Sequence, residues 1–259
     1  MRGRKKYFFD IPRMAAAGAK RKSYIFRALL FASFAFSSFL MFSCGTPSAE
    51  YLRPPYSFTN ESGILRLVHE SLNIDDTYIS SLFKGYEIYY HVFDGNSESA
   101  AAADISYLKS ISTYNPAYFI SNATAAGYYP LLKRIGNSQI LTNRPLIPVT
   151  NNTYSEFDLN MSTNSTWSIA AYGSDASNTA FANSVVRNSG DAISVDTRDF
   201  SFSSYYHAND QDYTGSDSPN PVYIVFFAVS YGISAVSLGN ALYSEPVIID
   251  APVKYTPNS

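Results

Sequence analysis

The sequence is almost without cysteine: Cys44 is the only one in 259 residues, so no disulfide can form within the chain. It has three histidines, and none has a His, Cys or carboxylate neighbour at the spacing of a helical metal site. No G-x-S-x-G turn is present, and no glycine-rich phosphate loop follows a predicted strand. These absences exclude disulfide-stapled scaffolds and leave no signature of a common metal, nucleotide or serine enzyme, so we expect no cofactor.

Positive charge is also scarce once the amino-terminal region is set aside. Residues 1–43 hold nine of the nineteen Lys and Arg residues but one of the twenty-one acidic residues. Ten basic and twenty acidic residues are left from Cys44 onward, a net charge of about −10. This charge argues against binding of nucleic acid, which needs a basic face, and against a polybasic membrane patch.

The uncharged stretch at 28–42 has fifteen residues, fewer than the roughly 20 that cross a bilayer as a helix. It follows nine basic residues, and this layout is typical of a secretory signal peptide. The stretch ends at Phe42-Ser43-Cys44-Gly45. This end resembles the signal of bacterial lipoproteins, in which a small residue precedes a cysteine that receives a diacylglycerol and becomes the acylated first residue.

The resemblance implies a signal peptide at 1–43, fatty acyl groups such as palmitate on Cys44, and a lipid-anchored protein of the bacterial cell envelope. Its membrane contact would then be made by the lipid, since two or more acyl chains anchor a protein stably. Ser43 fits the small position, and Cys44 stands where the chemistry requires it. The alternative is an ordinary cleaved signal with a chance cysteine. Met14 is a second candidate start and leaves the mature chain unchanged.

The rest of the chain divides into a tether and a folded part. Residues 44–56 contain three prolines and little apolar pattern, which predicts a lipid-anchored tether. Residues 57–259 are rich in Tyr, Phe, Val, Ile and Thr, which favour strands, and in Asn, Ser, Gly and Pro, which favour turns. We therefore expect a mainly β domain at 57–259, and composition leaves open whether it forms one core or two.

Alternating apolar residues predict a series of strands. The clearest are 85–93 and 222–231, which are apolar on both faces. Such strands make poor edges, so we expect them to pair directly, with residues 97–220 as decoration around their sheet. Further strands are expected at 63–72, 145–149, 156–161, 167–172, 192–195, 200–206 and 247–249, while residues 130–135 are left open between strand and helical turn.

Two stretches break this alternation. Residues 97–112 combine an alanine run with apolar residues at helical spacing, and Asn115-Pro116 follows, so we expect a helix there. A weaker pattern at 175–187 predicts a second, short helix. Residues 209–220, NDQDYTGSDSPN, are turn formers throughout and predict a loop.

The strongest strands together resemble a fibronectin type III domain. GYEIYYHVF (85–93) resembles that family's third strand and VYIVFFAVSYGIS (222–234) its sixth, with Tyr223 near the tyrosine-corner place. LYSEPVIID (242–250) would be the seventh strand. The resemblance implies an immunoglobulin-like or fibronectin III-like sandwich in which the third and sixth strands are antiparallel neighbours, with a large insertion between them. It also implies a role in binding or spacing.

The predicted loop carries the one metal-like pattern. Its spacing imitates the first half of an EF-hand loop, but Pro221 stands where a bidentate Glu is needed. A looser calcium site is therefore a weak candidate, and its ligands would be Asp210, Asp212 and Asp217. The alternative is a hydrated acidic loop. We expect the three histidines to be structural or solvent-facing; they are His69, His91 and His207.

Tyrosine, with 22 residues, is the most suggestive surplus. Tyrosine is enriched at recognition surfaces, but it also fills half-buried strand faces. The tyrosines considered for a surface are Tyr86, Tyr89, Tyr90, Tyr128, Tyr129, Tyr205 and Tyr206. The sequence favours a lipid-anchored binding or structural protein with a protein or glycan ligand. The alternative is an envelope hydrolase acting on glycans, which would need two carboxylates about 5–9 Å apart in a cleft.

Overall fold

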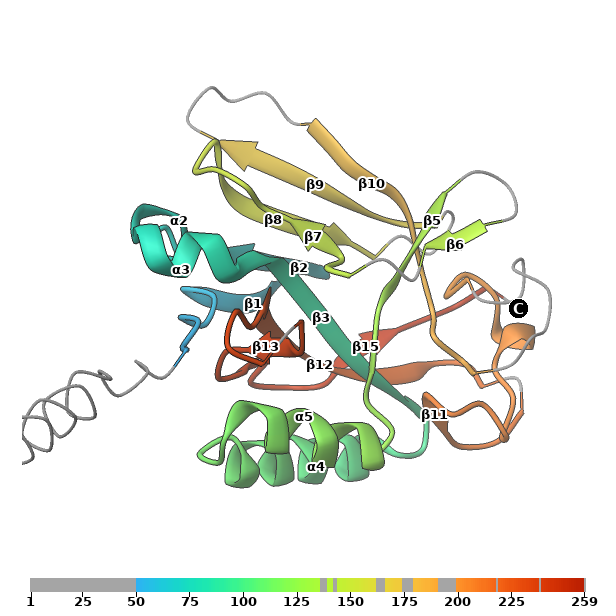
Figure 1. Ribbon diagram of the computed structural model, residues 1–259. Coiled ribbons are helices and arrows are strands. Elements are labelled where there is room, and N and C mark those ends of the chain that lie inside the picture. The colour runs from blue at the N-terminus through green and yellow to red at the C-terminus, as the bar shows by residue number, and fades with distance from the viewer. Residues whose placement is uncertain are drawn as a thin grey trace, which may run out of the picture. The chain divides into compact units, whose positions relative to one another are not determined.

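A computed structural model describes residues 50–135, 139–141, 144–161, 166–173, 179–190, 199–217, 219–237 and 239–258. Two β-sheets dominate this part of the chain (Figure 1). The first sheet is antiparallel, and its strands in spatial order are β1 (Ser57–Glu61), β2 (Ile64–Val68), β8 (Tyr154–Asn160), β9 (Trp167–Gly173), β10 (Thr179–Val186), β5 (Leu132–Ile135) and β6 (Gln139–Leu141).

The second sheet is built around two twelve-residue strands, β3 (Phe83–Asp94) and β12 (Val222–Ile233). The short strands β4 (Tyr129–Pro130), β7 (Ile147–Pro148) and β11 (Tyr213–Thr214) pair with β3. The short strands β13 (Ala241–Tyr243), β14 (Val247–Ile248) and β15 (Val253–Tyr255) pair with β12. Both central strands are therefore covered along their length.

The predicted pairing of the two strongest strands is confirmed. β3 and β12 are antiparallel neighbours from Val222 opposite Asp94 to Gly232 opposite Phe83. Residues early and late in the chain thus meet in one sheet, as the apolar character of both faces required. The expected mainly β fold with two packed sheets is confirmed with it.

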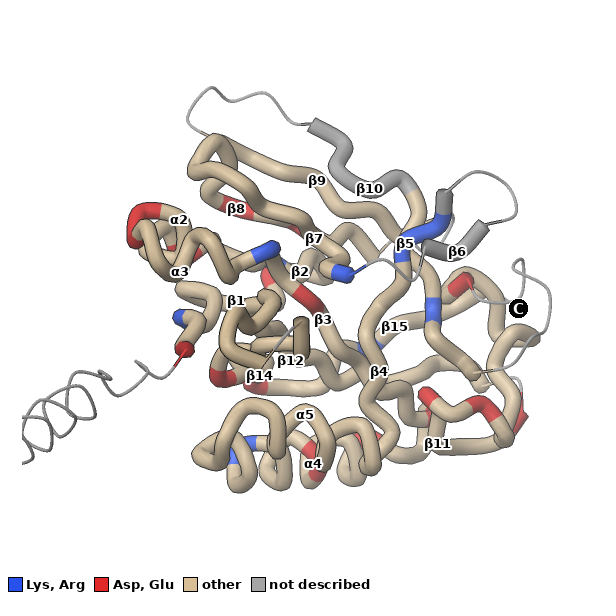
Figure 2. Tube along the Cα trace, viewed as in Figure 1, with Lys and Arg blue, Asp and Glu red and all other residues tan. Residues whose placement is uncertain are grey.

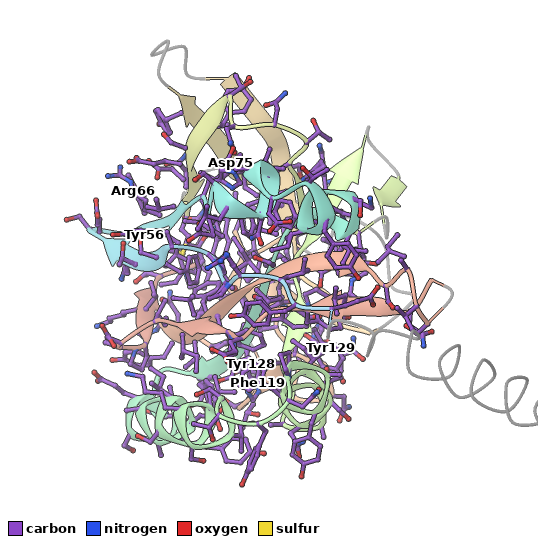
Figure 3. The ribbon with its side chains drawn as sticks, turned by 60° about the vertical axis from the view of Figure 1, so that its left-hand side comes forward. Tyr56, Arg66, Asp75, Phe119, Tyr128 and Tyr129 are labelled. Atoms are coloured by element: carbon purple, nitrogen blue, oxygen red, sulfur yellow. The ribbon has the colours of Figure 1, made fainter. Side chains whose placement is uncertain are left out.

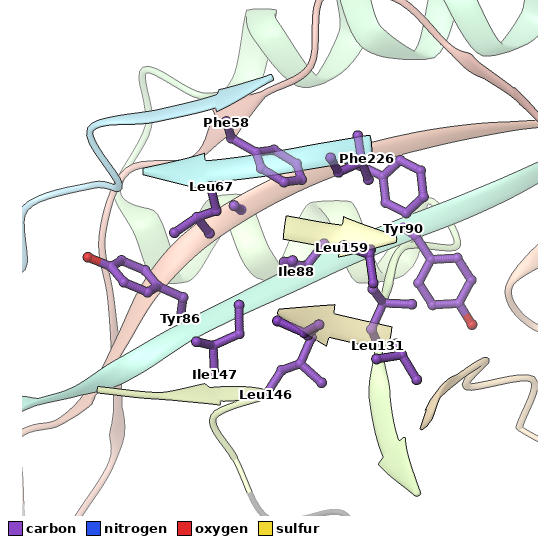
Figure 4. Close-up of a cluster of buried hydrophobic side chains, with 14 of the residues drawn as sticks. Phe58, Leu67, Tyr86, Ile88, Tyr90, Leu131, Leu146, Ile147, Leu159 and Phe226 are labelled. Atoms are coloured by element: carbon purple, nitrogen blue, oxygen red, sulfur yellow. The ribbon is translucent and has the colours of Figure 1, made fainter. Parts of the chain in front are cut away.

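The alternation of β3 and β12 supplies two cores. Side chains from one face of β3, such as Tyr86, Ile88 and Tyr90, pack between the sheets with Phe226 of β12 (Figure 4). The first sheet contributes residues such as Leu67 and Leu159 to the same cluster. Side chains from the opposite face of β3 and β12 enter a second cluster with the helices; they include Tyr89, Phe93, Val225 and Phe227. The arrangement is a sandwich with a helical layer on one side (Figure 1).

The helical layer consists of two helices that lie side by side in Figure 1, α4 (Glu98–Ile111) and α5 (Pro116–Ala125). α4 confirms the helix expected at 97–112, and it turns Ala101, Ile105 and Leu108 toward the second core. Asn115 caps α5, since its Oδ1 accepts a hydrogen bond from the Ala117 N–H at 2.9 Å, and Pro116 occupies the first helical turn, where it needs no donor.

Four α-helices are described rather than the expected one or two, because α2 (Leu72–Asp75) and α3 (Thr77–Leu82) also precede β3. Asp76 begins α3, and its carboxylate accepts hydrogen bonds from the N–H groups of Tyr78 and Ile79. The strand expected at 63–72 accordingly ends at Val68. Asp76 followed by a short apolar stretch is a helix-start signal. It was overlooked: only a strand at 63–72 is predicted before the strand at 85–93.

Two local predictions are wrong. The second helix expected at 175–187 is instead strand β10 over Thr179–Val186, because this segment pairs with β9 and buries Val185 in the sandwich core. The strand expected at 200–206 contains a 3₁₀ turn, η2 (Ser203–Tyr205), whose neighbour Phe202 makes an isolated bridge to Asn258. The strand expected at 192–195 lies outside the described residues.

The segment between the two main strands was expected to surround their sheet, but it forms most of the other sheet. It supplies β8, β9, β10 and β5 of the first sheet, and Phe157, Trp167 and Val185 pack in the sandwich core. Its edge strand β7 falls within the strand predicted at 145–149, and β8 and β9 match the strands predicted at 156–161 and 167–172. Residues 97–220 are therefore integral to the core, because the first sheet consists mostly of them.

The compact unit begins at Glu50, so residues 50–56 of the expected tether belong to the domain. Leu52 is fully buried, and the Arg53 carbonyl accepts hydrogen bonds from Asn73 and from Ser230 of β12. Burial of the Leu52 side chain holds the chain in place just before Pro54 and Pro55. The described residues contain no helix that is both long and apolar enough to span a bilayer.

Candidate binding surface

Cys44, the candidate lipidation site, lies outside the described residues, as does the predicted signal peptide at 1–43. Its assignment therefore stays a prediction from the sequence. The other candidates lie within the domain, and the structure shows which of them come together.

Two of the three candidate calcium ligands, Asp210 and Asp212, face an internal cation. Arg187 has no exposed surface, and its guanidinium donates to Asp212 Oδ1 at 2.7 Å and to Asp210 Oδ2 at 2.9 Å. Asp217 instead accepts a hydrogen bond from the Ala208 N–H at 2.7 Å. No group of three His, Cys, Asp or Glu residues suited to a metal occurs among the described residues. Asp210 and Asp212 are buried rather than hydrated, so their charges stabilise Arg187.

Tyrosine completes this buried network. The Tyr90 hydroxyl donates to Asp212 and accepts from the Asn188 N–H, and the Arg187 guanidinium lies 4.2 Å from the Tyr206 ring centroid. Burial and the Asp212 charge raise the pKa of Tyr90 well above its usual value. Burial lowers the pKa of Arg187, but Asp212 and the tyrosines outweigh burial and raise it. The network is therefore one cation that faces two carboxylates, with the Tyr90 hydroxyl bound to one of them.

A second buried carboxylate, Glu87 of β3, lies under an arginine at the surface. Arg144 donates to both Glu87 oxygens and to Tyr89, and its Nη1 donates to Tyr243 Oη at 2.9 Å. The guanidinium also lies 5.3 Å from the Tyr231 ring centroid. Burial raises the pKa of Glu87, and Arg144 opposes that rise. This carboxylate is thus matched by one cation and has no acidic partner in the cluster.

Two pockets of the described chain lack paired carboxylates. One, of about 120 Å³, is lined by uncharged residues that include Tyr154 and Phe157. Another, of about 240 Å³, includes Asp94 as its one acidic residue, with Ser216 and Asn220 beside it. A glycan hydrolase with two carboxylates would need a second acid in such a cleft. Neither pocket meets that requirement.

Most of the tyrosines considered for a surface are core residues. Tyr86, Tyr90, Tyr128 and Tyr206 have no exposed surface, and Tyr89 stacks on Phe227 with ring centroids 4.8 Å apart. Only Tyr129 and Tyr205 of that set are partly exposed. Figure 3 shows Tyr128 and Phe119 between the helices and the sheet. The predicted Tyr-rich strand therefore packs inside the domain rather than presenting a binding face.

The helical layer carries exposed tyrosines instead. Tyr107, Tyr114 and Tyr118 are 39%, 53% and 55% exposed. Tyr114 and Tyr118 contact edge to face, with ring centroids 5.4 Å apart. We call the exposed side of α4, α5 and their connection, with these three residues, the tyrosine surface. Ile105, Leu108 and Phe119 occupy the buried faces of the two helices, and the tyrosines lie on the opposite side. The helical periodicity of 97–112 in the sequence could therefore have predicted that Tyr107 is exposed.

The tyrosine surface has little charge, as Figure 2 shows for the two helices. Glu98 accepts a hydrogen bond from the Tyr223 hydroxyl at 2.9 Å, and Lys109 pairs with Asp250 at 3.0 Å. Asp104 accepts from the Tyr128 hydroxyl at 2.7 Å. The other side chains of α4 and α5 are uncharged, mostly Ala, Ser and Tyr. Tyrosine among small neutral residues is the composition of many recognition surfaces.

No family model, curated protein or solved structure matches this chain. The arrangement of the described residues therefore carries the functional argument alone.

Proposed function

We propose that the protein is a lipid-anchored protein of the bacterial cell envelope that binds a neutral glycan through the tyrosine surface. The observation that carries the anchor is the position of the single cysteine, Cys44, directly after a short apolar run and a small residue. Three features of the domain support binding by the tyrosine surface: ring exposure, low charge and a rigid support.

Exposed tyrosine suits a sugar ligand. Each ring offers a flat apolar face, which can cover the carbon-bound hydrogens of a sugar ring, and a hydroxyl that can exchange hydrogen bonds with sugar hydroxyls. The surrounding Ser and Thr side chains of α4, α5 and their connection add short hydroxyl groups. A polyanion finds no basic patch there, since Lys109 is paired with Asp250.

The support for the surface is rigid. α4 and α5 pack on β3 and β12 through Ala101, Leu108, Phe119 and Ala123, each fully buried. Rings held on packed helices, as those of Tyr107 and Tyr118 are, lose less freedom on binding than rings on loops, which favours affinity. The alternative glycan-hydrolase hypothesis is less favoured, because neither described pocket offers paired carboxylates.

Binding is tested by retention of the protein on insoluble neutral polysaccharides and on purified bacterial cell-wall glycan. We expect the triple variant Tyr107→Ala, Tyr114→Ala, Tyr118→Ala to lose at least about tenfold in affinity, because exposed aromatic anchors carry much of such binding energy. The matched control is Tyr51→Ala, Tyr56→Ala, Tyr78→Ala, which removes three exposed tyrosines from elsewhere on the domain.

Circular dichroism should show both triple variants folded, since all six side chains are exposed. Equal binding by the wild type and both variants would contradict the proposal, as would no binding of any glycan. Retention of a purified envelope protein by the wild type and the control, with no glycan bound, would instead identify a protein ligand.

A further inference from the structure

Three residues from separate elements form a hydroxyl, imidazole and carboxylate series. Thr214 of β11 lies with its Oγ1 3.1 Å from His91 Nε2 on β3. On the other side of the ring, His91 Nδ1 lies 3.7 Å from Asp104 Oδ2 of α4. The sequence did not predict this series, because the three residues are far apart and have no signature spacing; Thr214 was considered only as part of the imitated calcium loop.

The imidazole is held in one orientation. Its ring is 7% exposed and packs against Phe93, with centroids 4.3 Å apart, and against Tyr128 at 5.2 Å. Gly127 allows this position, because a Cβ there would lie 3.0 Å from the ring. The Tyr128 hydroxyl donates to Asp104 at 2.7 Å and so fixes the carboxylate beside the imidazole. The ring is therefore positioned by packing on three sides.

The neighbours of the ring decide which of its two nitrogens carries the proton. His91 Nδ1 is buried and has no hydrogen-bond partner among the described residues, and the acidic group nearest to it is Asp104. A carboxylate on that side favours the tautomer with a proton on Nδ1, which leaves Nε2 free to accept the Thr214 hydroxyl proton. The distance of 3.7 Å is longer than a hydrogen bond, but contacts of this kind often tighten only with substrate present.

The hydroxyl end is accessible. Thr214 is exposed, and the next residue, Gly215, packs so closely that a Cβ there would meet Asp94, which lines the pocket of about 240 Å³ together with Ser216. The backbone N–H of Gly215 directly follows Thr214 in the chain. A donor that directly follows the nucleophile is a common position for stabilising a developing oxyanion.

We propose that Thr214 is the nucleophile of an acyl-transfer site, with His91 as its general base and Asp104 orienting His91. The substrate class is a carboxylic ester with a small, uncharged acyl group, since the pocket that begins at Ser216, two residues beyond Thr214, is small and polar and contains Asp94, which disfavours anions. Tyr128 is a positioning residue, because it acts on Asp104 rather than on the substrate.

The steps balance as an ester hydrolysis. Thr214 Oγ1 attacks the ester carbonyl carbon while His91 Nε2 takes its proton, and the bond to the alcohol oxygen breaks as His91 returns that proton to the leaving alkoxide. An acyl-threonine and a free alcohol result. Water then attacks the acyl carbon, giving its proton to His91, and Thr214 leaves with that proton restored. The net change is ester plus water to carboxylic acid plus alcohol, without an oxidant or a cofactor.

The test uses the mature full-length protein in detergent with p-nitrophenyl acetate and butyrate, followed by mass spectrometry after a fluorophosphonate probe. We expect hydrolysis and a label on the Thr214 peptide. Thr214→Ala should lower the rate at least about 100-fold and abolish the label, whereas Thr214→Ser should retain both. His207→Gln, at an exposed histidine outside the series, is the control and should match the wild type.

Because Thr214 is exposed, its variants should fold, and circular dichroism checks that they do. Hydrolysis at the wild-type rate by folded Thr214→Ala would overturn the proposal, and so would an absence of both turnover and label in the wild type. A label on Thr214 that persists in His91→Asn at the wild-type rate would overturn the role of His91.

Discussion

Arg187 is a fully buried charge, and its partners account for its place in the interior. Its guanidinium donates to two carboxylates and to the Tyr205 carbonyl, and it lies over an aromatic ring. An unpaired cation in such a place would be very costly, because burial removes its hydration. The sequence left Asp210 and Asp212 between a weak calcium site and a hydrated acidic loop, since a loop composition says nothing about a cation from a distant part of the chain, here Arg187 directly after β10.

We predict that Asp212→Ala destabilises the domain by about 3–5 kcal/mol, because it leaves Arg187 and the Tyr90 hydroxyl with one partner fewer in the interior. Asp217→Ala, an exposed acid of the same loop, should cost about 1 kcal/mol or less. The measurement is urea unfolding of both variants and the wild type. Equal unfolding free energies for the two variants would show that the buried pair contributes no more than a surface acid.

His69 supplies a pH-dependent prediction. Its Nδ1 lies 2.6 Å from the Tyr86 hydroxyl and its Nε2 lies 2.8 Å from Asn152 Oδ1, and the Tyr86 hydroxyl already accepts the Glu70 N–H. The neutral ring with a proton on Nε2 fits these partners. Burial lowers the pKa of His69, although the bond to Asn152 opposes this.

A lowered pKa in the folded state means that the unfolded chain binds the proton more readily, so this stabilisation is full above the unfolded pKa of about 6.5 and is lost as the pH falls below it. We therefore expect the unfolding free energy to fall between about pH 7.5 and pH 5.5 more steeply in the wild type than in His69→Gln. An unchanged slope in His69→Gln would mean that another group titrates in this range.

At the scale of elements, a glycine explains how β3 meets β7. Gly85 has a φ of +142°, and a Cβ on it would collide with the Ile147 carbonyl oxygen. Tyr86 and Ile147 are paired residues in this part of the sheet. The absence of a side chain therefore lets the backbones of β3 and β7 approach each other. This explains on steric grounds, without any family resemblance, why a glycine precedes Tyr86 in β3.

Gly85→Ala should cost more than about 3 kcal/mol, since the backbone of β7 must move. Gly63→Ala is the matched control: it has a φ of +87°, but a Cβ on it would meet nothing within 4 Å, so we expect only the conformational cost of about 1–2 kcal/mol. Thermal and urea unfolding separate the two effects. Similar losses at both sites would attribute the Gly85 effect to backbone conformation alone.

Elements with strong local patterns could be predicted from the sequence, and those defined by distant partners could not. β3, β12 and α4 have unbroken alternation or helical spacing. β10 was mistaken for a helix because its apolar residues satisfy both periods and pairing with β9 decides between them. α5 was overlooked because Asn115-Pro116 was interpreted only as a stop, although Asn followed by Pro also begins a helix.

For the molecule as a whole, the two central strands join distant parts of the chain in one sheet that separates two cores. β12 contributes Ile224 and Phe226 to the sandwich core and Val225 and Phe227 to the helical core. Their burial could be predicted, because a strand that is apolar on both faces needs cover on both. The first sheet and the tyrosine surface could not, since they depend on how the segment between β3 and β12 folds back.

A chain truncated before Pro221 should therefore be insoluble. It retains β3 but loses β12, which exposes the apolar edge of β3 and opens both cores. Expression of residues 50–220 and of residues 50–259 under the same conditions, followed by sedimentation, provides the comparison. A soluble, cooperatively unfolding fragment without β12 would show that the first sheet folds independently.

The anchor at Cys44 is the central claim about where the protein acts, and metabolic labelling with an alkyne fatty acid tests it most directly. The wild-type protein, expressed in bacteria, should incorporate the label, and it should sediment with membranes, because acyl chains on Cys44 hold it there. Cys44→Ser should lose the label and leave the membrane fraction. Labelling and membrane retention of Cys44→Ser at wild-type levels would contradict the account.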